Sequence, residues 1–207
     1  MFLMKSDRLF YSCLLVALGI VFAWSAINPH DYFTWLLEVL PVLIALPLLW
    51  ATHRRFTFTR MAYALIFVHA VVLIVGGHYT YALVPLGNWA REAFDLTRNH
   101  YDRIGHFAQG FIPAIVAREI LLRTSPLKRG KWLFTIVVSI CIAISALYEL
   151  VEWGVAEATG TAAEAFLGTQ GDVWDTQKDM ALCTVGAIAA LVTLGRLHDR
   201  GLDRITK

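Results

Sequence analysis

The chain has 207 residues, of which 57% are hydrophobic and 16% are charged, and its mean hydropathy is +0.58. This composition excludes an ordinary soluble globular protein, and the formal net charge of +2 is too small to indicate a nucleic-acid partner. The length fits one domain, so we predict a single integral membrane domain over residues 1–207 that is embedded in a lipid bilayer.

Six apolar stretches are long enough to cross a bilayer of about 30 Å, which takes around 20 helical residues. They cover residues 9–27, 33–51, 61–77, 104–122, 132–151 and 180–197. The sequence therefore predicts an all-α fold, a polytopic membrane helical bundle of six transmembrane helices. The first stretch also resembles a signal peptide, because Lys5 and Arg8 precede it and small residues follow it. We expect an uncleaved helix, and cleavage would leave five spans.

The basic residues are distributed unevenly between the two sides of this arrangement. One side, which includes both chain ends, holds 14 of the 18 lysines and arginines. The positive-inside rule then predicts that both termini are cytoplasmic and that the connections 28–32, 78–103 and 152–179 lie outside. Near the inner end of the fourth helix, Arg118 and Glu119 are expected to extend toward the membrane surface, where their charges stay hydrated.

Three prolines lie inside two of the predicted helices: Pro41 and Pro47 in the second, and Pro113 in the fourth. A proline inside a helix removes a backbone donor and bends the helix. Bent helices leave room for a cavity. The alternative is that membrane helices tolerate proline simply because their neighbours satisfy the freed backbone groups.

The fourth predicted helix carries a polar stripe. Asp102, His106, Gln109 and Pro113 recur at helical spacing and so share one face. A carboxylate and an imidazole one turn apart can share a metal ion, or the carboxylate can orient the ring so that His106 acts as an acid or a base. The structural alternative is that Asp102 follows an Asn99 cap and that His106 only bonds a neighbouring helix.

Two glutamates, Glu149 and Glu152, stand one turn apart at the outer end of the fifth predicted helix. When both are ionised they repel each other, unless a cation, a histidine or a proton lies between them. Candidate partners are a metal ion or one of four side chains, His106, His78, Arg103 and Lys178. The alternative is a helix end at which both glutamates reach water.

Three aspartates precede or begin the sixth predicted helix. Asp172 followed by Asp175 resembles a helix N-cap with an acidic residue in the first turn. Capping explains Asp179 poorly, because this residue lies further along, on the face of Asp175. We therefore predict a functional role for Asp175 and Asp179 and a supporting one for Asp172.

Other polar residues near the same side are weaker candidates for the functional site. His78 and Tyr79 close the third predicted helix and are expected to support the site with a ligand or a hydrogen bond. Glu38 and His69 lie inside helices without an evident partner in the sequence, and we interpret the lone His69 as a packing residue. Residues 89–101 mix aromatic and charged side chains and predict a short amphipathic segment on the outer membrane surface.

Four segments carry a resemblance to a known family. They are GHYTY at 77–81, HYDRIGHF at 100–107, YELVEW at 148–153 and GTQGDVWDTQKDM at 168–180. These segments resemble the YjdF-like family of bacterial inner-membrane proteins, and the match covers nearly the whole chain. The resemblance implies a multi-pass protein of the bacterial cytoplasmic membrane and implies no particular reaction.

The last three predicted helices are also similar, more distantly, to the VanZ-like family, which is linked to glycopeptide-antibiotic tolerance. Asp102 and His106 match its Asp-x-x-x-His-Phe motif, and Glu149 matches its helix-end glutamate. Asp179 and Gly186 match its spacing of an aspartate and a following glycine.

Our leading hypothesis is an enzyme whose site opens to the periplasm and acts on an envelope lipid or a lipid-linked group. The candidate catalytic residues are Asp102, His106, Glu149, Glu152, Asp175 and Asp179, supported by His78, Tyr79, Gln109 and Asp172. We predict that His106, Glu149 and Asp179 bind a divalent metal ion, because oxygen and nitrogen ligands suit Mg, Mn or Zn.

Two other functions stay open. The same acids and His106 would also serve as the relay of a proton- or cation-coupled transporter. In a non-catalytic assembly or structural protein, the polar side chains would only bind the helices to one another. The common catalytic signatures are absent from the sequence, and it carries no signal for an oligomeric state.

Overall fold

The computed structural model describes residues 5–160 and 164–205, and this part of the chain is helical and contains no strand. The long helices are α1 (Lys5–Ser25), α2 (Tyr32–Thr52), α3 (Arg60–Tyr79), α5 (Tyr101–Thr124), α6 (Lys131–Thr159) and α8 (Asp175–Ile205). The short ones are η1 (Tyr81–Leu83), α4 (Pro85–Ala93) and α7 (Glu164–Leu167). The predicted all-α fold class is confirmed.

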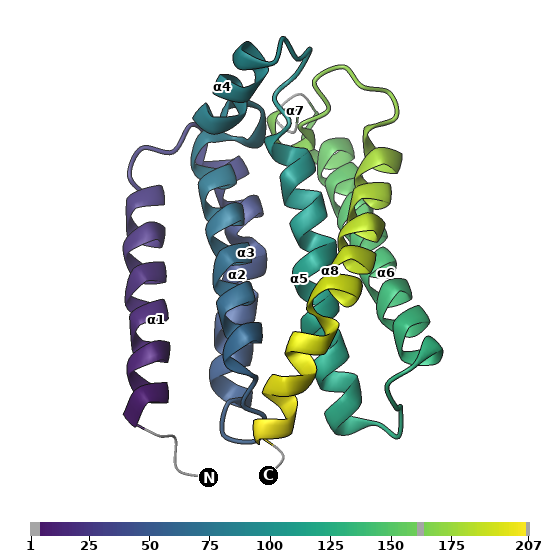
Figure 1. Cartoon of the computed structure of the whole chain (residues 1–207). Helices are drawn as coiled ribbons and strands as arrows, with labels where there is room; N and C mark the ends of the chain where they lie inside the picture. The colour runs from purple at the N-terminus through teal and green to yellow at the C-terminus, as the bar shows by residue number, and fades with distance from the viewer. Residues whose placement is uncertain (1–4, 161–163, 206–207) are drawn as a thin grey trace.

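Five helices in the described part of the chain are long and apolar enough to cross a membrane: α1, α2, α3, α6 and α8. Helix α5 contains the predicted fourth span, 104–122, but is not among the five, because charged and polar residues interrupt it near both ends and along one face. Figure 1 shows α5 in the middle of the bundle, beside α3 and α8. Among the long helices of the described part, the central one is therefore the one without an apolar stretch of that length.

The two ends of the bundle differ. Helices α4 and α7 gather with their connections at one end, which we call the α4 end (Figure 1). The start of α1 and the last turns of α8 lie at the opposite end, which we call the termini end (Figure 1). Helix α4 begins with Pro85 in its first turn and exposes Leu86 and Trp89. It covers only the start of the predicted amphipathic segment 89–101, whose Arg98 and Tyr101 are buried.

Two predicted helix boundaries were wrong. Helix α6 continues past the expected end at residue 151 to Thr159, and α8 begins at Asp175 rather than at residue 180. Polar residues in these stretches hid the extra turns from a search for apolar runs. Glu152 and Asp179 therefore lie inside regular helices, which hold their side chains in defined directions.

The bundle packs as two groups of helices. Helices α1, α2 and α3 share one apolar core around Val39 and Ile74, and α5, α6 and α8 share another around Ile115 and Val137. Helix α3 contacts α5 and so joins the two groups. The candidate polar residues lie on helices from both groups, so their relative positions depend on this packing.

Helices α5 and α8 make the most extensive contact in the bundle, and glycines permit it. A Cβ atom at Gly110 of α5 would overlap the backbone carbonyl oxygen of Cys183 on α8. A Cβ atom at Gly186 of α8 would likewise overlap the carbonyl oxygen of Phe107 on α5. Small residues let membrane helices approach this closely, and the approach brings the polar face of α5 against α8.

A buried polar network at the termini end corrects the expectation for Arg118 and Glu119. Glu119 has no exposed surface and accepts hydrogen bonds from the backbone N–H and hydroxyl of Thr59 (2.9 and 2.8 Å) and from Nε2 of His198 (3.0 Å). Arg118 is also buried and donates to Asp199 (2.6 Å) and to Nδ1 of His198 (2.9 Å). We call these five residues the Glu119 network. Neither Arg118 nor Glu119 extends to the surface, because the additional turns of α8 bring His198 and Asp199 beside them.

Candidate functional site

Two arginines bind three aspartates where α5 and α8 begin. Arg103 of α5 donates through Nη2 to Asp172 (3.0 Å) and Asp175 (2.5 Å) and through Nη1 to Asp179 (2.8 Å). Arg98, just before α5, also donates to Asp175 (2.6 Å). We call these five residues the arginine cluster. Two guanidinium groups face three carboxylates here, and Lys178 supplies a third positive charge at Asp172.

The arginine cluster also fixes the connection that leads into α8. The guanidinium of Arg98 donates to the backbone carbonyl oxygens of Gly168 and Thr169, both at 3.1 Å. Asn99 and Gln170 exchange two further hydrogen bonds, of 3.0 and 2.9 Å. The turn before α8 is therefore held on the start of α5 by contacts that span about 70 residues of sequence.

Asp172 has a different local role from the expected helix cap. Its side chain accepts from the backbone N–H of Trp174 (3.1 Å), so it closes the turn before α8 and not the first turn of the helix itself. Lys178 binds the same carboxylate at 2.6 Å. The hydrogen bond from Lys178 and the one from the Trp174 backbone hold the pKa of Asp172 below its usual range.

We expect the Arg103→Gln variant to be strongly destabilised, because Asp179 loses its arginine partner and Asp172 and Asp175 keep only Lys178 and Arg98. Removing one partner of a buried ion pair costs roughly 3–5 kcal/mol. Thermal unfolding in detergent at pH 7 measures the loss, and Arg91→Gln on α4, a partly exposed position, serves as the control. An unchanged melting temperature would contradict the role assigned to Arg103.

His106 lies below the arginine cluster, on the next turn of α5. Its Nδ1 is 3.1 Å from the amide oxygen of Gln109, and its Nε2 is 3.4 Å from Oδ1 of Asp102. One donor atom each from Asp102, His106 and Asp179 lies within 4.8 Å of the others, and all three residues are buried. The polar stripe predicted on α5 therefore meets α8, and we call these three residues the His106 group.

The two glutamates of α6 are buried as well, and Glu149 approaches His106. Oε1 of Glu149 is 3.8 Å from Nδ1 of His106 and has no hydrogen-bond partner in the described part of the chain. Glu152 is also buried, and none of the described ion pairs includes it. Among the cationic partners predicted for these glutamates, only His106 approaches one of them, because Arg103 and Lys178 bind the aspartates.

A cavity of about 140 Å³ lies between α2, α3, α5 and α6. Its polar lining includes Asp102, His106 and Glu152 together with Glu38 of α2, and Pro41 and Pro113 line it as well. Tyr148 of α6 donates to Oε2 of Glu38 at 3.3 Å. The sequence analysis found no partner for Glu38. A buried acid in an apolar span is nevertheless by itself a signal of function.

The predicted supporting residues fall into two sets. The structure brings Gln109 and Asp172 to this region, as described above. It places His78 and Tyr79 elsewhere, since Nδ1 of His78 is 2.9 Å from the carbonyl oxygen of Ser25 and both rings contact Trp24. Both residues lie in the last turn of α3, where their rings contact Trp24 of α1.

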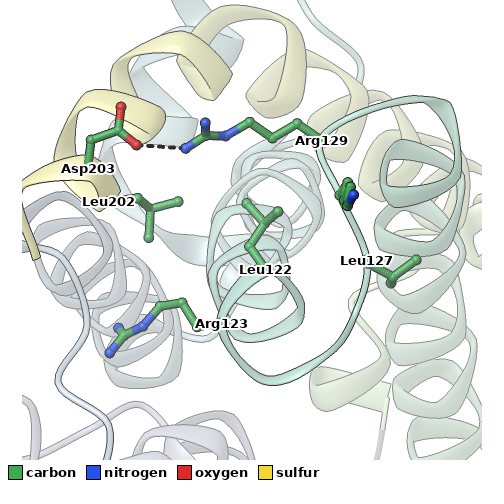
Figure 2. A pocket seen from close by; sticks show the side chains of 7 residues that line it. Leu122, Arg123, Leu127, Arg129, Leu202 and Asp203 are labelled. Carbon is green, nitrogen blue, oxygen red and sulfur yellow. Dashed lines mark hydrogen bonds and ion pairs between the residues drawn. The ribbon is translucent and has the colours of Figure 1, made fainter. Parts of the chain in front are cut away.

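A larger and more open pocket, of about 420 Å³, lies at the termini end. Figure 2 shows Arg129 reaching across it to Asp203, while Arg123 extends in another direction. Arg123 donates instead to Glu119 at 2.8 Å. Because both arginines are bound to carboxylates, this pocket lacks the converging reactive groups that the α4 end has.

Comparison with known proteins supports the membrane assignment. The model of a family described as predicted membrane protein (DUF2238) matches residues 10–200. The chain is 49% identical over 189 residues to the inner membrane protein YjdF of Escherichia coli (strain K12). The aligned residues make up 91% of this chain and 90% of that protein. No solved structure matches the chain.

These matches confirm the predicted YjdF-like resemblance and the location in the bacterial inner membrane as a multi-pass protein. Neither match bears on the similarity of the last three helices to the VanZ-like family, which stays a prediction. The chain belongs to the DUF2238 family of predicted membrane proteins.

Proposed function

We propose that the chain crosses the inner membrane six times, with both termini in the cytoplasm and the α4 end facing the periplasm. Helix α5 has 24 residues and would be about 36 Å long at 1.5 Å per residue, enough for a crossing. Its polar side chains are buried among the other helices, so they do not need to face lipid. The start of α1 and the end of α8 lie on the same side, which agrees with an even number of crossings (Figure 1).

We further propose that the protein is a metal-dependent enzyme of the membrane, in which the His106 group holds a divalent ion. The observation that carries this proposal is the hydrogen bond from His106 to Gln109. The amide oxygen of Gln109 accepts from Nδ1 of His106, so Nε2 is the ring nitrogen that faces Asp102, beside Asp179. In the neutral tautomer with its proton on Nδ1, Nε2 offers a lone pair to a cation shared with the two carboxylates, and a ligating histidine with its other N–H bonded is the usual arrangement.

The ligand set differs from the one expected from sequence in one residue. Asp102, His106 and Asp179 form the compact set, while Glu149 lies beside Nδ1 of His106. The unpartnered Oε1 of Glu149 makes it a candidate base for a water molecule on the metal. The chemistry that these groups support is attack of an activated water on an ester or phosphoester of an envelope lipid or a lipid-linked group.

Two measurements on the purified full chain test this proposal. Equilibrium dialysis against Mn²⁺ or Zn²⁺ should give about one bound ion per chain, which a chelator removes. Incubation with a bacterial lipid extract, with and without the ion, should show metal-dependent release of a head group by mass spectrometry. Protein that binds neither ion would exclude the metal-dependent enzyme, and metal binding without any lipid turnover would exclude this class of substrate.

A proton- or cation-coupled transporter is the second candidate, because the Glu119 network places further buried ionisable groups on α5 and α8 at the opposite end of the bundle. In proteoliposomes, such a transporter would carry a flux that Glu149→Gln abolishes and that a chelator leaves unchanged. The metal-dependent enzyme predicts no flux. In a purely structural protein, the same variant would lower the amount of folded protein, which a blot detects.

A further inference from the structure

We propose that the cavity between α2, α3, α5 and α6 binds the ammonium group of a membrane lipid whose acyl chains leave it laterally between α2 and α6. This inference rests on the proposed enzyme function and names the substrate class of its site. It goes beyond the metal ion, because it concerns Glu38 and Glu152, which are not among the proposed metal ligands.

The charge of the cavity points to a positively charged ligand. Glu38 and Glu152 both line the cavity and are more than nine-tenths buried, and neither takes part in an ion pair among the described residues. The lining contains no lysine or arginine. Two buried carboxylates in a membrane are costly unless a cation compensates them.

An ammonium group fits these carboxylates better than a second metal ion does. The His106 group is the one set of three or more donors in the described residues that is tight enough for a metal, and Glu38 and Glu152 are not part of it. An ammonium donates three separate hydrogen bonds and tolerates acceptors that are further apart. The rings of Tyr81 and Tyr148 also line the cavity and offer their faces to a cation.

An unsatisfied histidine gives an independent sign of a polar ligand. His69 of α3 lines the cavity, and its Nε2 is buried without a hydrogen-bond partner in the described residues. An orphan buried nitrogen costs about 1–3 kcal/mol, so a ligand that reaches it recovers that energy. The cavity of about 140 Å³ corresponds to roughly four or five water molecules at ~30 Å³ each, which is enough for a short amine-bearing head group.

The packing around the cavity indicates that the ligand enters from the bilayer. Helix α2 packs on α3, and α6 packs on α5 and α8, so no extensive contact joins α2 to α6. At the α4 end, α7 contacts both α2 and α6 and covers the cavity from that side, with Phe166 beside Tyr148. Ile144 of α6 lines the cavity and is also exposed on the surface of the bundle. A lipid can therefore place its chains against the bundle and its head group inside.

Native mass spectrometry of the purified full chain tests the proposal with defined lipids. We expect phosphatidylethanolamine to be retained about ten-fold more than phosphatidylglycerol of the same chains, because hydrogen bonds to a charged group are worth about 1.5–3 kcal/mol. Glu38→Gln and Glu152→Gln should each remove this preference. Glu157→Gln, an exposed acid on the same helix as Glu152, should keep it. Equal retention of the two lipids, or an unchanged preference in both cavity variants, would overturn the proposal.

Further binding measurements distinguish the remaining explanations. N-acetylated phosphatidylethanolamine, which lacks the positive charge, should lose the preference on wild-type protein, so the test does not depend on how the variants fold. Soluble ethanolamine should not displace the lipid at equal concentration, and displacement would show that the site takes a free amine instead. Mn²⁺ binding should stay unchanged in Glu38→Gln, so failure of lipid binding with an intact metal site is distinguishable from failure of the proposed enzyme.

Discussion

We expect the His106→Ala variant to lose its divalent metal ion and to remain in the membrane at the wild-type level. The ring supplies the only nitrogen ligand of the His106 group, and two aspartates alone form a weak and incomplete site. Gln109→Leu should keep the ion but weaken its binding about 10–100-fold, because the bond that orients the ring is lost.

Elemental analysis of the purified protein gives the metal content, and a blot of membrane fractions gives the protein level. His30→Ala is the matched control, since His30 is exposed at the α4 end and lies outside the site. Full metal occupancy in His106→Ala would overturn the assignment. A normal metal affinity in Gln109→Leu would show that Nδ1 does not set the orientation of the ring.

Substituting Gly110 by alanine should disturb the close packing of α5 against α8. The added Cβ would overlap the Cys183 carbonyl, which belongs to the backbone of α8 and cannot move without shifting that helix. Overpacking typically costs about 1–3 kcal/mol, which lowers the melting temperature of a chain of this size by on the order of 5–10 °C. A shift of α8 also displaces Asp179, so metal affinity should fall together with stability.

The control for Gly110→Ala is Gly195→Ala on α8, where an added Cβ meets nothing within 4 Å. Alanine favours a helix over glycine by about 1 kcal/mol, so this variant should be neutral or slightly stabilised. Melting curves of the three proteins in the same detergent make the comparison. Equal melting temperatures for Gly110→Ala and wild type would mean that α5 and α8 are not packed as closely as described.

Much of the fold could be predicted from local patterns. Apolar runs identified the helices, and the helical spacing of Asp102, His106 and Gln109 identified the polar face that meets α8. The boundaries of α6 and α8 were wrong because polar turns extend apolar helices without changing their hydropathy signal. Arg118 and Glu119 were misplaced for the same reason, since their partner His198 lies in such a turn.

The candidate site was harder to predict because its contacts join distant segments. Arg98 binds Asp175 and the backbone near Gly168, and no local pattern relates residues so far apart. Glu38 comes from a helix of the other packing group and meets Tyr148 only through tertiary structure. Sequence indicated which side chains were expensive to bury but not which of them would be neighbours.

The Glu119 network has a mechanical implication for the bundle. Thr59 immediately before α3, Glu119 of α5 and His198 of α8 are bonded to one another without exposed polar atoms on Glu119, so these helices are locked at the termini end. At the other end, the described residues show one direct hydrogen bond between α2 and α6, from Tyr148 to Glu38, and α7 contacts both helices. Helices α2 and α6 are thus joined more weakly than the helices of the Glu119 network. If the proposed lipid enters between α2 and α6, its head group leaves the cavity by the same route.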